Sequence, residues 1–349
     1  MNSWDVIIAG AGIIGVSLAL ELRERGAQVL VLDKGEPGAE ASSAAAGMLA
    51  ASDPETPVAL RPLATESARM FPEYVSKIEG LAGFGIDFRR QGTIALMDRM
   101  AAPPPAYSPL SSDEFQRLEP SLGSQGRQPF YIQEDTVDPR LLMLAALAAA
   151  RKQGVEVRGN TDVKTIRSRA NNVEVETVAG VFTASAAVNC RGAWAGVPVR
   201  PRKGQMLYLQ PEQRNLLAHV VHAPDVYIVP RSSGKILVGA TVEDAGFDKT
   251  VSRSTIQELH QTAAAYLPDL QRAPMIESWA GLRPGTPDDL PILGPAEIPG
   301  MFVAGGHFRN GILLAPVTAR IMAEVITGKP PAIDISPFAV SRFCQSLME

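Results

Sequence analysis

Hydrophobic and polar positions near the N-terminus follow a strand–helix–strand order. Val6–Ala9 is a short, mostly β-branched apolar run, which is typical of a strand buried in a parallel sheet. Apolar residues at helical spacing then continue to Arg25, where Gly26 ends the helix, and Gln28–Leu32 is a second apolar run. The pattern therefore predicts a βαβ unit at the start of the chain.

The rest of the chain alternates longer helical segments with short apolar runs. Helices are expected over 61–80, over Pro139–Gln153 with Asp138 as the cap, over Ile256–Tyr266, and soon after Gly311. Strands are expected over Val155–Val157, Val163–Ile166, Val173–Val178, Ala187–Asn189, Met206–Leu209, Val226–Val229 and Ile236–Ala240. A nucleotide-binding domain interrupted by a second, β-rich domain would produce this order, which indicates an α/β fold, α+β overall.

Three further stretches are expected as connections. The Pro-rich segment 101–109 is typical of an exposed loop, and 230–234 is expected to join two strands as a hairpin. The basic run Arg-Pro-Arg-Lys at 200–203 is expected as a solvated turn where the chain crosses between domains.

The loop after the first strand carries Gly10, Gly12 and Gly15 in the spacing GxGxxG. The first glycine permits a tight turn, the second lets backbone approach a pyrophosphate, and the third allows close packing of helix and strand. The helix N-terminus offers free N–H groups to phosphates, and Asp33 at the end of the second strand can accept hydrogen bonds from a ribose diol. The unit predicts a dinucleotide site, against the alternative of a purely structural turn, and does not distinguish NAD from FAD.

A stretch of small residues, 35–51, follows this unit. Its Ser-Ser-Ala-Ala-Ala-Gly core has too little bulk for an ordinary core helix. Small side chains let backbone lie against a flat ligand or another helix. The alternative is a poorly packed helix in a tight corner.

The composition is that of an ordinary globular protein long enough for two domains. The chain has 349 residues, of which 46% are hydrophobic and 20% charged. A net charge of −4 argues against a nucleic-acid or anionic-membrane surface. Cys190 and Cys344 are too few for a disulfide framework or a Cys-based zinc site. The apolar run Ile13–Leu22 falls short of the roughly 20 residues that span a bilayer, and no signal peptide is recognisable, so we expect a cytoplasmic protein without a transmembrane segment.

No metal site is expected. His219 and His222 form an HxxH pair, but no third ligand stands near them. The neighbouring carboxylates Asp288 and Asp289 are expected to point apart in a loop. His307 is expected to make a structural hydrogen bond rather than to act as a base.

Five motifs, in this order, resemble the D-amino-acid oxidase family of flavoproteins, and most closely its glycine-oxidising members. They are GAGIIG at 10–15, SSAAAGML at 42–49, YIVPRSSGKILVGAT at 227–241, AGLRPGT at 280–286 and GHFRNGILLAP at 306–316. The last four are more specific than the glycine loop, and the resemblance covers almost the whole chain. It implies a Rossmann-like FAD-binding domain of the D-amino-acid oxidase/glutathione reductase type, formed by 1–80, 140–200 and 280–349. A β-sheet-rich substrate-binding domain, formed by 81–139 and 201–279, would interrupt it.

The cofactor implied by the resemblance is FAD, bound non-covalently, because 42–49 contains neither the Cys nor the His that tethers flavin in related enzymes. In this picture Asp33 meets the ribose and the backbone of Val163 meets the adenine. The start of the C-terminal helix stabilises negative charge on the flavin ring. The cofactor-binding residues that the resemblance implies are Gly10, Gly12, Ile13, Ile14, Gly15, Asp33, Lys34, Ser42, Ser43, Ala46, Gly47, Met48, Leu49, Val163, Gly192, Trp194, Gly306, Arg309, Asn310, Gly311 and Ile312.

The resemblance also implies a substrate site. Arg283 would bind an amino-acid carboxylate with both arms of its guanidinium, Tyr227 would donate a hydrogen bond to the same carboxylate, and Arg309 would lie beside ring and pocket. From the residues alone, a surface or interdomain ion pair for Arg283 and a core position for Tyr227 remain open. Asp225 and Val242 replace a His and a Met that such chains can carry, which leaves the preferred amine open.

The implied reaction is hydride transfer from the α-carbon of glycine or another small or D-amino acid to flavin N5. Oxygen would take the electrons and give H₂O₂, and the imine would hydrolyse to a keto acid and ammonia. Such a reaction depends mainly on orientation, which agrees with the absence of a Ser–His–Asp pattern. Alternatives are a D-amino-acid or secondary-amine dehydrogenase, a 2-hydroxy-acid oxidase, a nicotinamide dehydrogenase and a flavin-binding module without turnover. A homo-oligomer is compatible with the sequence.

Overall fold

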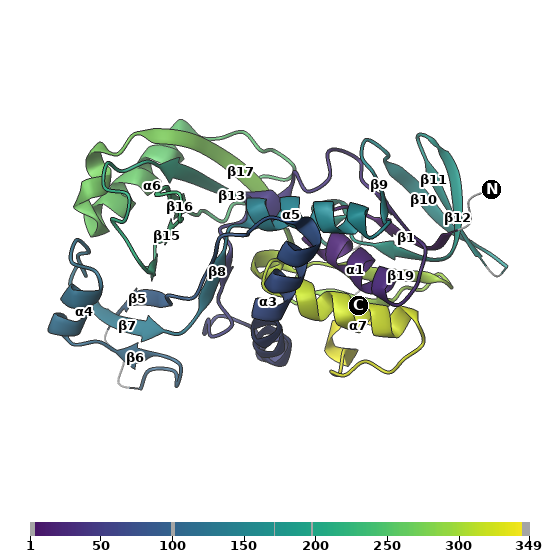
Figure 1. Cartoon of the computed structure of the whole chain (residues 1–349), viewed down its shortest axis with the longest axis horizontal. Coiled ribbons are helices and arrows are strands. Elements are labelled where there is room, and N and C mark those ends of the chain that lie inside the picture. The colour runs from purple at the N-terminus through teal and green to yellow at the C-terminus, as the bar shows by residue number, and fades with distance from the viewer. Residues whose placement is uncertain (1–3, 99–101, 171, 197, 344–349) are drawn as a thin grey trace.

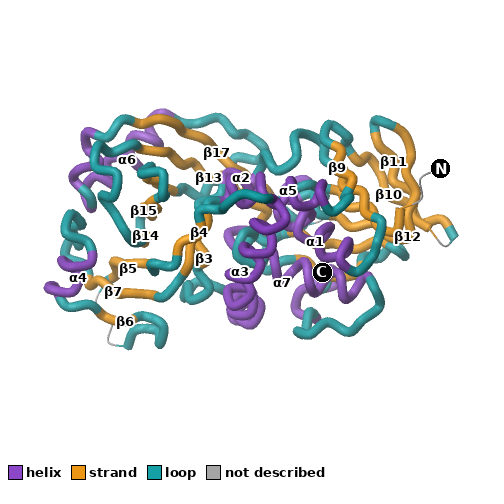
Figure 2. The backbone as a smooth tube through the Cα atoms, viewed as in Figure 1, coloured by secondary structure: helices purple, strands orange, loops and turns teal. Residues whose placement is uncertain are grey.

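The structure is a computed structural model, and it describes residues 4–98, 102–170, 172–196 and 198–343. Two large sheets lie at opposite ends of an elongated molecule, with helices between and below them (Figure 1). The tube in Figure 2 shows that segments from the first, middle and last parts of the chain meet in the helical region between the sheets. The mixed α/β class predicted from the sequence is confirmed.

The first sheet has the strand order β10-β11-β12-β1-β2-β9, with β19 beside β12 and β18 beside β19. Its strands are β1 (Trp4–Ala9), β2 (Val29–Leu32), β9 (Glu156–Arg158), β10 (Val163–Arg169), β11 (Asn172–Thr177), β12 (Gly180–Asn189), β18 (Ile292–Pro295) and β19 (Met301–Gly305). Strands β9, β2, β1, β12 and β19 are parallel neighbours, whereas β10, β11 and the first half of β12 form an antiparallel meander.

The continuous apolar run of β1 is explained by burial on both faces of the sheet. Val6 and Ile8 pack into the large core formed with the helices. Ile7 and Ala9 pack into a second core against the side chains of the meander. Because side chains alternate along a strand, only an uninterrupted apolar sequence can fill both cores.

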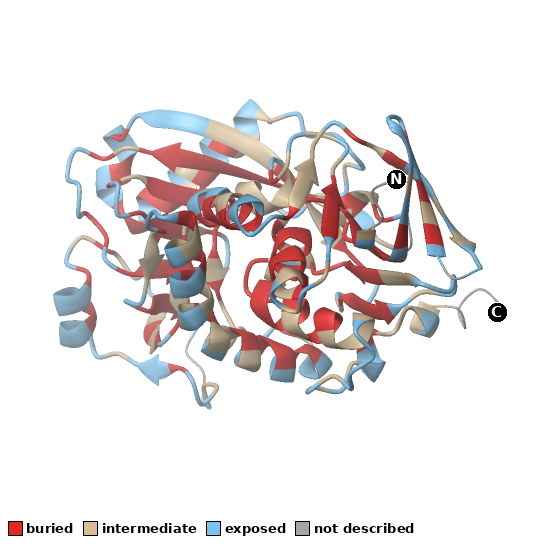
Figure 3. Cartoon of the chain, turned by 45° about the vertical axis from the view of Figure 1, so that its right-hand side comes forward, coloured by how far each residue is buried: buried red, intermediate tan, exposed pale blue. Residues whose placement is uncertain are grey.

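Four helices build the large core of this half: α1 (Ile13–Glu24), α3 (Arg61–Ala82), α5 (Pro139–Lys152) and α7 (Ala315–Ile326). Helix α1 packs against both α5 and α7. The helix faces that meet one another and the sheet are buried, whereas their outer faces are exposed (Figure 3). Asp138 caps α5 as expected, since its carboxylate accepts hydrogen bonds from the N–H groups of Arg140 and Leu141.

The second sheet has the order β17-β13-β16-β15-β14-β5-β7-β6. Its strands are β5 (Thr93–Met97), β6 (Ser108–Pro109), β7 (Gln128–Ile132), β13 (Arg200–Leu209), β14 (Val220–His222), β15 (Tyr227–Pro230), β16 (Ile236–Gly239) and β17 (Met275–Gly285). One face packs on α6 (Arg253–Tyr266) through residues such as Leu207, Ile228 and Val238. The opposite face carries Met206, Tyr227 and their neighbours toward the centre of the molecule.

A small third sheet joins the two halves. It consists of β3 (Met48–Leu49), β8 (Asp135–Val137) and β4 (Phe88–Arg89). The remaining short helices are α2 (Ala41–Ala44) and α4 (Ser112–Leu118). Short 3-10 segments occur at Val58–Leu60, Gly192–Trp194, Pro268–Arg272, Phe308–Asn310, Ser336–Phe338 and Val340–Phe343. None of the helices in the described ranges is long and apolar enough to cross a membrane.

Most predicted elements are present, and two expectations differ from the structure. The basic run 200–203 is not a turn but the start of β13, where Lys203 is buried and donates to the carbonyl of Thr250. The last helix begins at Ala315, soon after Gly311 as expected, and a 3-10 turn at Phe308–Asn310 precedes it. The end of the Pro-rich segment pairs as β6, while residue 101 lies outside the described residues. The proposed division into discontinuous domains stays a prediction.

Candidate functional site

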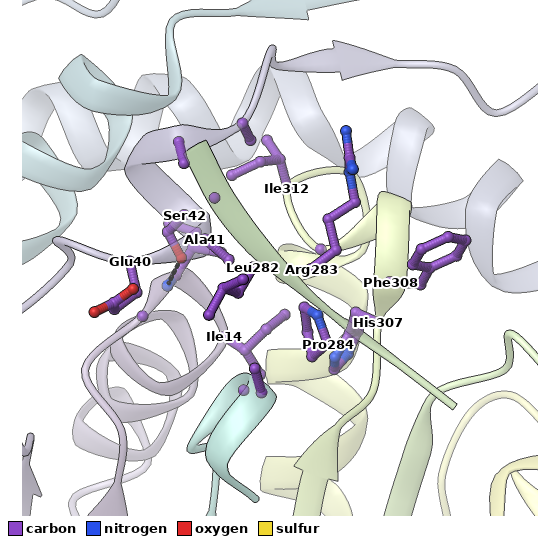
Figure 4. Close-up of a pocket in the computed structure, with 18 of the residues that line it drawn as sticks. Ile14, Glu40, Ala41, Ser42, Leu282, Arg283, Pro284, His307, Phe308 and Ile312 are labelled. Atoms are coloured by element: carbon purple, nitrogen blue, oxygen red, sulfur yellow. Dashed lines mark hydrogen bonds between the residues drawn. The ribbon is translucent and has the colours of Figure 1, made fainter. Parts of the chain in front are cut away.

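A cavity of about 720 Å³ runs through the centre of the molecule, a size typical of ligand sites. Its walls come from the loop between β1 and α1, the small-residue stretch, the segments 190–194 and 304–312, and the inner faces of β13, β14, β15 and β17. Figure 4 shows β17 passing with Arg283 and Pro284 between the segment that carries Ser42 and the segment that carries His307. The glycine loop and the predicted substrate residues thus line one continuous space.

Two of the three loop glycines are required by the packing of the protein itself. Gly10 has a φ of +110°, and a β-carbon there would lie 2.3 Å from the carbonyl oxygen of Cys190. A β-carbon at Gly15 would lie 2.0 Å from the carbonyl oxygen of Gly10. At Gly12 a β-carbon would meet only the hydroxyl oxygen of Ser42, at 3.1 Å. The open side of Gly12 therefore faces the cavity, as a pyrophosphate site requires.

Asp33 is held at the edge of this loop by backbone donors. One carboxylate oxygen accepts from the N–H of Ala11 at 2.7 Å and the other from the N–H of Gly35 at 2.9 Å. Ser42 supports the same loop, because its hydroxyl accepts from the N–H of Ile13 at 2.9 Å. A carboxylate has about four acceptor positions, so Asp33 keeps acceptors for a ligand in the cavity that it lines.

The end of the cavity beyond Asp33 is formed by aromatic and cationic side chains. The ammonium of Lys34 lies 3.2 Å from the centre of the Trp194 ring, and burial lowers the pKa of this lysine. Trp194 stacks in turn on Phe247, with 5.4 Å between ring centres. The carbonyl of Val163, expected beside an adenine, accepts from Nη1 of Arg191 at 3.2 Å.

The small residues of 41–47 are explained by close contacts with the second half of the molecule. A β-carbon on Gly281 of β17 would lie 2.6 Å from the β-carbon of Ala44, so the strand passes directly over this segment. The buried guanidinium of Arg231 donates to the carbonyl of Ala46 at 2.6 Å and to that of Val137 at 3.2 Å. Sequence reasoning assigned no role to Arg231, because its partners are distant in sequence.

Tyr227 and Arg283 lie next to each other in the part of the cavity that the second sheet lines. Nη1 of Arg283 donates to the carbonyl of Thr241 at 3.0 Å, and the hydroxyl of Tyr227 donates to Sδ of Met206 at 3.4 Å. Burial raises the pKa of Tyr227, while the charge of Arg283 and a hydrogen bond with it act in the opposite direction. Among the described residues, no carboxylate lies within ion-pair distance of Arg283. The cavity therefore contains a cation that pairs with no carboxylate of the residues that the structure describes.

The C-terminal segment contributes two different side chains. Arg309 lines the cavity but pairs with the exposed Glu55, with 2.9 Å between Nη1 and Oε2. His307 is buried, its Nε2 lies 3.1 Å from the hydroxyl oxygen of Thr318, and burial lowers its pKa to about 3. The imidazole is therefore neutral at ordinary pH, which agrees with the expected structural role.

Four residues predicted to bind the cofactor lie outside the cavity lining. Gly15 packs on Gly10, and Leu49 belongs to the large core. The hydroxyl of Ser43 donates to the carbonyl of Gly38 at 2.7 Å. Gly306 faces Thr286, whose Cγ2 would lie 2.6 Å from an added β-carbon. The predicted residues that do line it are Gly10, Gly12, Ile13, Ile14, Asp33, Lys34, Ser42, Ala46, Gly47, Met48, Val163, Gly192, Trp194, Tyr227, Arg283, Arg309, Asn310, Gly311 and Ile312.

The expected pocket positions Asp225 and Val242 are not in the lining. Asp225 accepts from the hydroxyl of Tyr266 at 3.1 Å, and Val242 is 55% exposed. His222 lines the cavity instead, directly opposite Tyr227 in the pairing of β14 with β15. Sequence reasoning noticed this histidine only as half of an HxxH pair. Its partner His219 instead binds Glu119, with 2.6 Å between Nδ1 and Oε1.

No group of three or more metal-binding side chains occurs in the parts of the chain that the structure describes. The cavity fits FAD on three grounds. Gly12 has no side chain between its backbone and the cavity, and Asp33 offers hydrogen-bond acceptors beside it. The same cavity is also lined by the cation Arg283.

Comparisons with known proteins agree with this geometry. The family described as FAD dependent oxidoreductase (DAO) matches residues 5–325. Glycine oxidase from Geobacillus kaustophilus is 34% identical over 367 residues, which cover 98% of this chain and 97% of that protein. The bifunctional protein ThiO/ThiG from Trichormus variabilis is 37% identical over 97% of this chain, and the chain spans 55% of its length.

Solved structures give the same result. The crystal structure of the Geobacillus kaustophilus glycine oxidase matches with a TM-score of 0.92 at 34% identity, over 98% of this chain and 99% of that one. Iminodiacetate oxidase from Chelativorans sp. BNC1 matches with a TM-score of 0.87 at 27% identity, over 96% of this chain and 98% of that one. The chain belongs to the DAO family of FAD-dependent oxidoreductases.

Proposed function

We propose that this protein oxidises glycine or another small or D-amino acid at the α-carbon, with O₂ as the electron acceptor. In the balanced reaction, amino acid, O₂ and water give the 2-oxo acid, ammonia and H₂O₂. The observation that carries the proposal is the unpaired guanidinium of Arg283 beside the hydroxyl of Tyr227, in the cavity that also holds the dinucleotide loop.

The substrate carboxylate would bind to these two residues. A guanidinium suits this task because its planar fork donates two parallel hydrogen bonds to a carboxylate. Tyr227 adds a neutral donor, and burial keeps its hydroxyl protonated, since burial raises its pKa. Together the two groups fix the orientation of the α-carbon, the main contribution that a protein makes to this type of reaction.

FAD, when bound, supplies the two-electron acceptor for the α-hydrogen. The protein has to bind the amine in its neutral form, because a protonated amine cannot become an imine. Buried His307 is not the base in this proposal, because its Nε2 contacts the hydroxyl of Thr318 and its pKa is far below neutrality. Orientation by Arg283 and Tyr227, rather than proton transfer by a side chain, is therefore the proposed basis of catalysis.

A secondary amine is the second candidate substrate, favoured by the similarity to an iminodiacetate oxidase. The carboxylate would bind in the same way, and the nitrogen would carry a substituent. Transfer of electrons to an acceptor other than O₂, as in a dehydrogenase, and oxidation of a 2-hydroxy acid are further alternatives that use the same anchor.

Anaerobic mixing of the FAD-loaded protein with candidate substrates tests the proposal. Glycine, D-alanine, sarcosine, iminodiacetate and glycolate would be compared by the loss of the visible flavin absorption. We expect bleaching by at least one of the four amines and colour recovery with H₂O₂ release when air is admitted. Bleaching by glycolate alone would establish a hydroxy-acid oxidase, and slow recovery in air that a quinone accelerates would establish a dehydrogenase. If no small or D-amino acid bleaches the flavin, the proposed function is wrong.

A further inference from the structure

The cavity extends past the predicted carboxylate anchor along the inner face of the second sheet. Met206, Gly239, Tyr227 and His222 are consecutive partners on β13, β16, β15 and β14. The next strand is β5, whose Thr93 also lines the cavity. Because Gly239 has no side chain, the Tyr227 ring lies across it, 2.6 Å from where a β-carbon would be, and leans toward Met206. His222 and Thr93 therefore lie on the side of Tyr227 that faces away from Met206.

This far end is closed by a buried carboxyl group that the proposed reaction does not use. Glu134 lines the cavity just beyond β7 and is only 9% exposed. Its Oε1 accepts from the N–H of Ser52 at 3.0 Å, and it also hydrogen-bonds with Thr93. The side chain is thus fixed in the wall of the cavity. We call His222, Thr93 and Glu134 the distal recess.

The distal recess lies beyond the reach of glycine. Neighbouring strands are roughly 4.8 Å apart, so β5 lies roughly 10 Å from β15 and its Tyr227. The nitrogen of glycine is only roughly 2.5 Å from its carboxylate carbon. A glycine bound to Arg283 and Tyr227 would leave the recess empty, whereas a longer substrate would fill it.

The charges around the recess favour a donor or a cation. Asp53 also lines the cavity there, and its charge adds to the burial that raises the pKa of Glu134 to about 7. Two arginines lie in this region, and both already pair with other carboxylates: Arg309 with Glu55, and Arg90 with Asp135. The ring of His222 has no hydrogen-bond partner among the described residues, and burial lowers its pKa, so it adds no positive charge at neutral pH. A buried carboxyl that is costly to ionise gains most from an incoming cation.

We propose that the distal recess binds a second, cationic or N–H-donating group of the substrate, with Glu134 as the acceptor. The preferred substrate is then an amino acid whose side chain or N-substituent ends in an amine, rather than glycine or a dicarboxylate. The inference rests on the proposed function, because the substrate carboxylate has to bind at Arg283 for its other end to reach the recess.

Binding of acids that cannot be oxidised tests the inference without turnover. The ligands are 5-aminopentanoate, pentanoate and glutarate, together with their shorter and longer homologues, titrated by calorimetry into the FAD-loaded protein at pH 8. They share the carboxylate and differ only at the far end. We expect one of the amino acids to bind roughly tenfold or more tightly than the matched alkanoate, and the dicarboxylate to bind most weakly.

Two variants test whether Glu134 causes the preference for the amino acid. Glu134→Gln keeps an oxygen for the Ser52 N–H but removes the charge, so the preference for the amino acid should fall to about onefold, that is, no preference. Asp135→Asn removes the neighbouring carboxylate, which does not line this cavity, and should keep the preference. Equal affinity for amino acid and alkanoate at every length, tighter binding of the dicarboxylate, or equal loss in both variants would overturn the inference.

The proposed function can fail separately from this inference. If alkanoates bind and glycine reduces the flavin, but no amino acid binds more tightly than its matched alkanoate, only the inference about the distal recess is wrong. If no acid binds to the wild type, and Arg283→Met leaves the rate of flavin reduction unchanged, the substrate carboxylate does not bind at Arg283. Both proposals are then wrong.

Discussion

The guanidinium of Arg283 lies directly over Gly204 of the neighbouring strand. A β-carbon at Gly204 would be 2.2 Å from Nη1 and 2.6 Å from Cζ of Arg283. The two residues belong to β17 and β13, which pair over ten positions, so their approach is set by the sheet. The guanidinium of Arg283 can therefore occupy this position only because Gly204 has no side chain.

Gly204→Ala should displace the anchor without unfolding the protein. The added methyl group would meet the mobile end of a side chain, which can move, rather than backbone. Because small misplacement of a substrate-orienting group is costly, we expect kcat/KM for the best amine to fall by roughly 10- to 100-fold. Steady-state kinetics and the flavin spectrum would be compared with those of a control, Gly85→Ala. Gly85 is exposed, and the nearest atom to an added β-carbon there is 3.7 Å away. An unchanged kcat/KM would mean that Arg283 has room to bind from another position.

Arg283→Ala should spare FAD and remove substrate binding. Arg283 lies on β17 in the wall that the second sheet forms, and no carboxylate in the described part of the chain would lose an ion-pair partner through the change. We expect a loss of roughly 2–5 kcal/mol in kcat/KM, the scale for removing one member of a buried charge pair. Arg283→Lys should recover only part of it, because an ammonium lacks the planar fork. Loss of the flavin colour on purification would instead give Arg283 a structural role.

Gly12→Ala should impair FAD binding, whereas Gly10→Ala should impair folding. At Gly12 the new methyl group meets only the Ser42 hydroxyl and the cavity, so the protein should fold and lose FAD affinity. At Gly10 it would collide with the backbone of Cys190 at a φ of +110°, so folding itself should be damaged. Circular dichroism and FAD titration separate the two effects. A Gly12→Ala protein that binds FAD normally would contradict the assignment of this loop to the pyrophosphate.

Arg231→Met should loosen the small-residue segment. It removes the donors to the carbonyls of Ala46 and Val137, which are then left without these partners in a buried region. We expect a loss of roughly 1–3 kcal/mol in stability and weaker FAD binding. Thermal unfolding with and without added FAD measures both. Arg231→Lys, which can keep one donor, should lie between the variant and the wild type.

His307→Gln should make the protein less sensitive to acid. The folded-state pKa of about 3 lies below the ordinary value of 6.5. Between these two pH values, the unfolded chain therefore binds a proton that the folded chain does not. The stabilising contribution is complete above pH 6.5 and is lost as the pH falls toward 3. From pH 7 to pH 5 the wild type should lose roughly 2 kcal/mol more stability than the variant. Urea unfolding at the two pH values checks this, and equal losses would contradict it.

Local signals in the sequence were enough to predict the loop and the acid at the nucleotide end of the cavity. A buried strand, three glycines and an acid lie within the first 33 residues, so their geometry follows from short-range rules of strands, turns and helix ends. The cap of α5 was predictable for the same reason, because Asp138 acts on N–H groups two and three residues away.

The same local rules were misleading where pairing with distant segments decides the conformation. The run 200–203 looks like a solvated turn, but ten backbone pairings with β17 make it a strand and bury Lys203. The expected pocket position Asp225 turns outward to Tyr266, and His222 takes the place opposite Tyr227. A shift of register along β14 and β15 exchanges the residues that face the cavity, and nothing local in the sequence sets that register.

The sequence by itself therefore determined the class of fold and, through its motifs, the family. It also predicted the glycine loop as part of the FAD site and Arg283 and Tyr227 as substrate-binding residues. Only the tertiary structure decided what surrounds them. Gly204 lies beneath the guanidinium, Arg231 supports the small-residue segment, and Glu134 closes the far end of the cavity. These contacts join residues far apart in sequence, so they form only when the second sheet closes against the nucleotide half of the molecule.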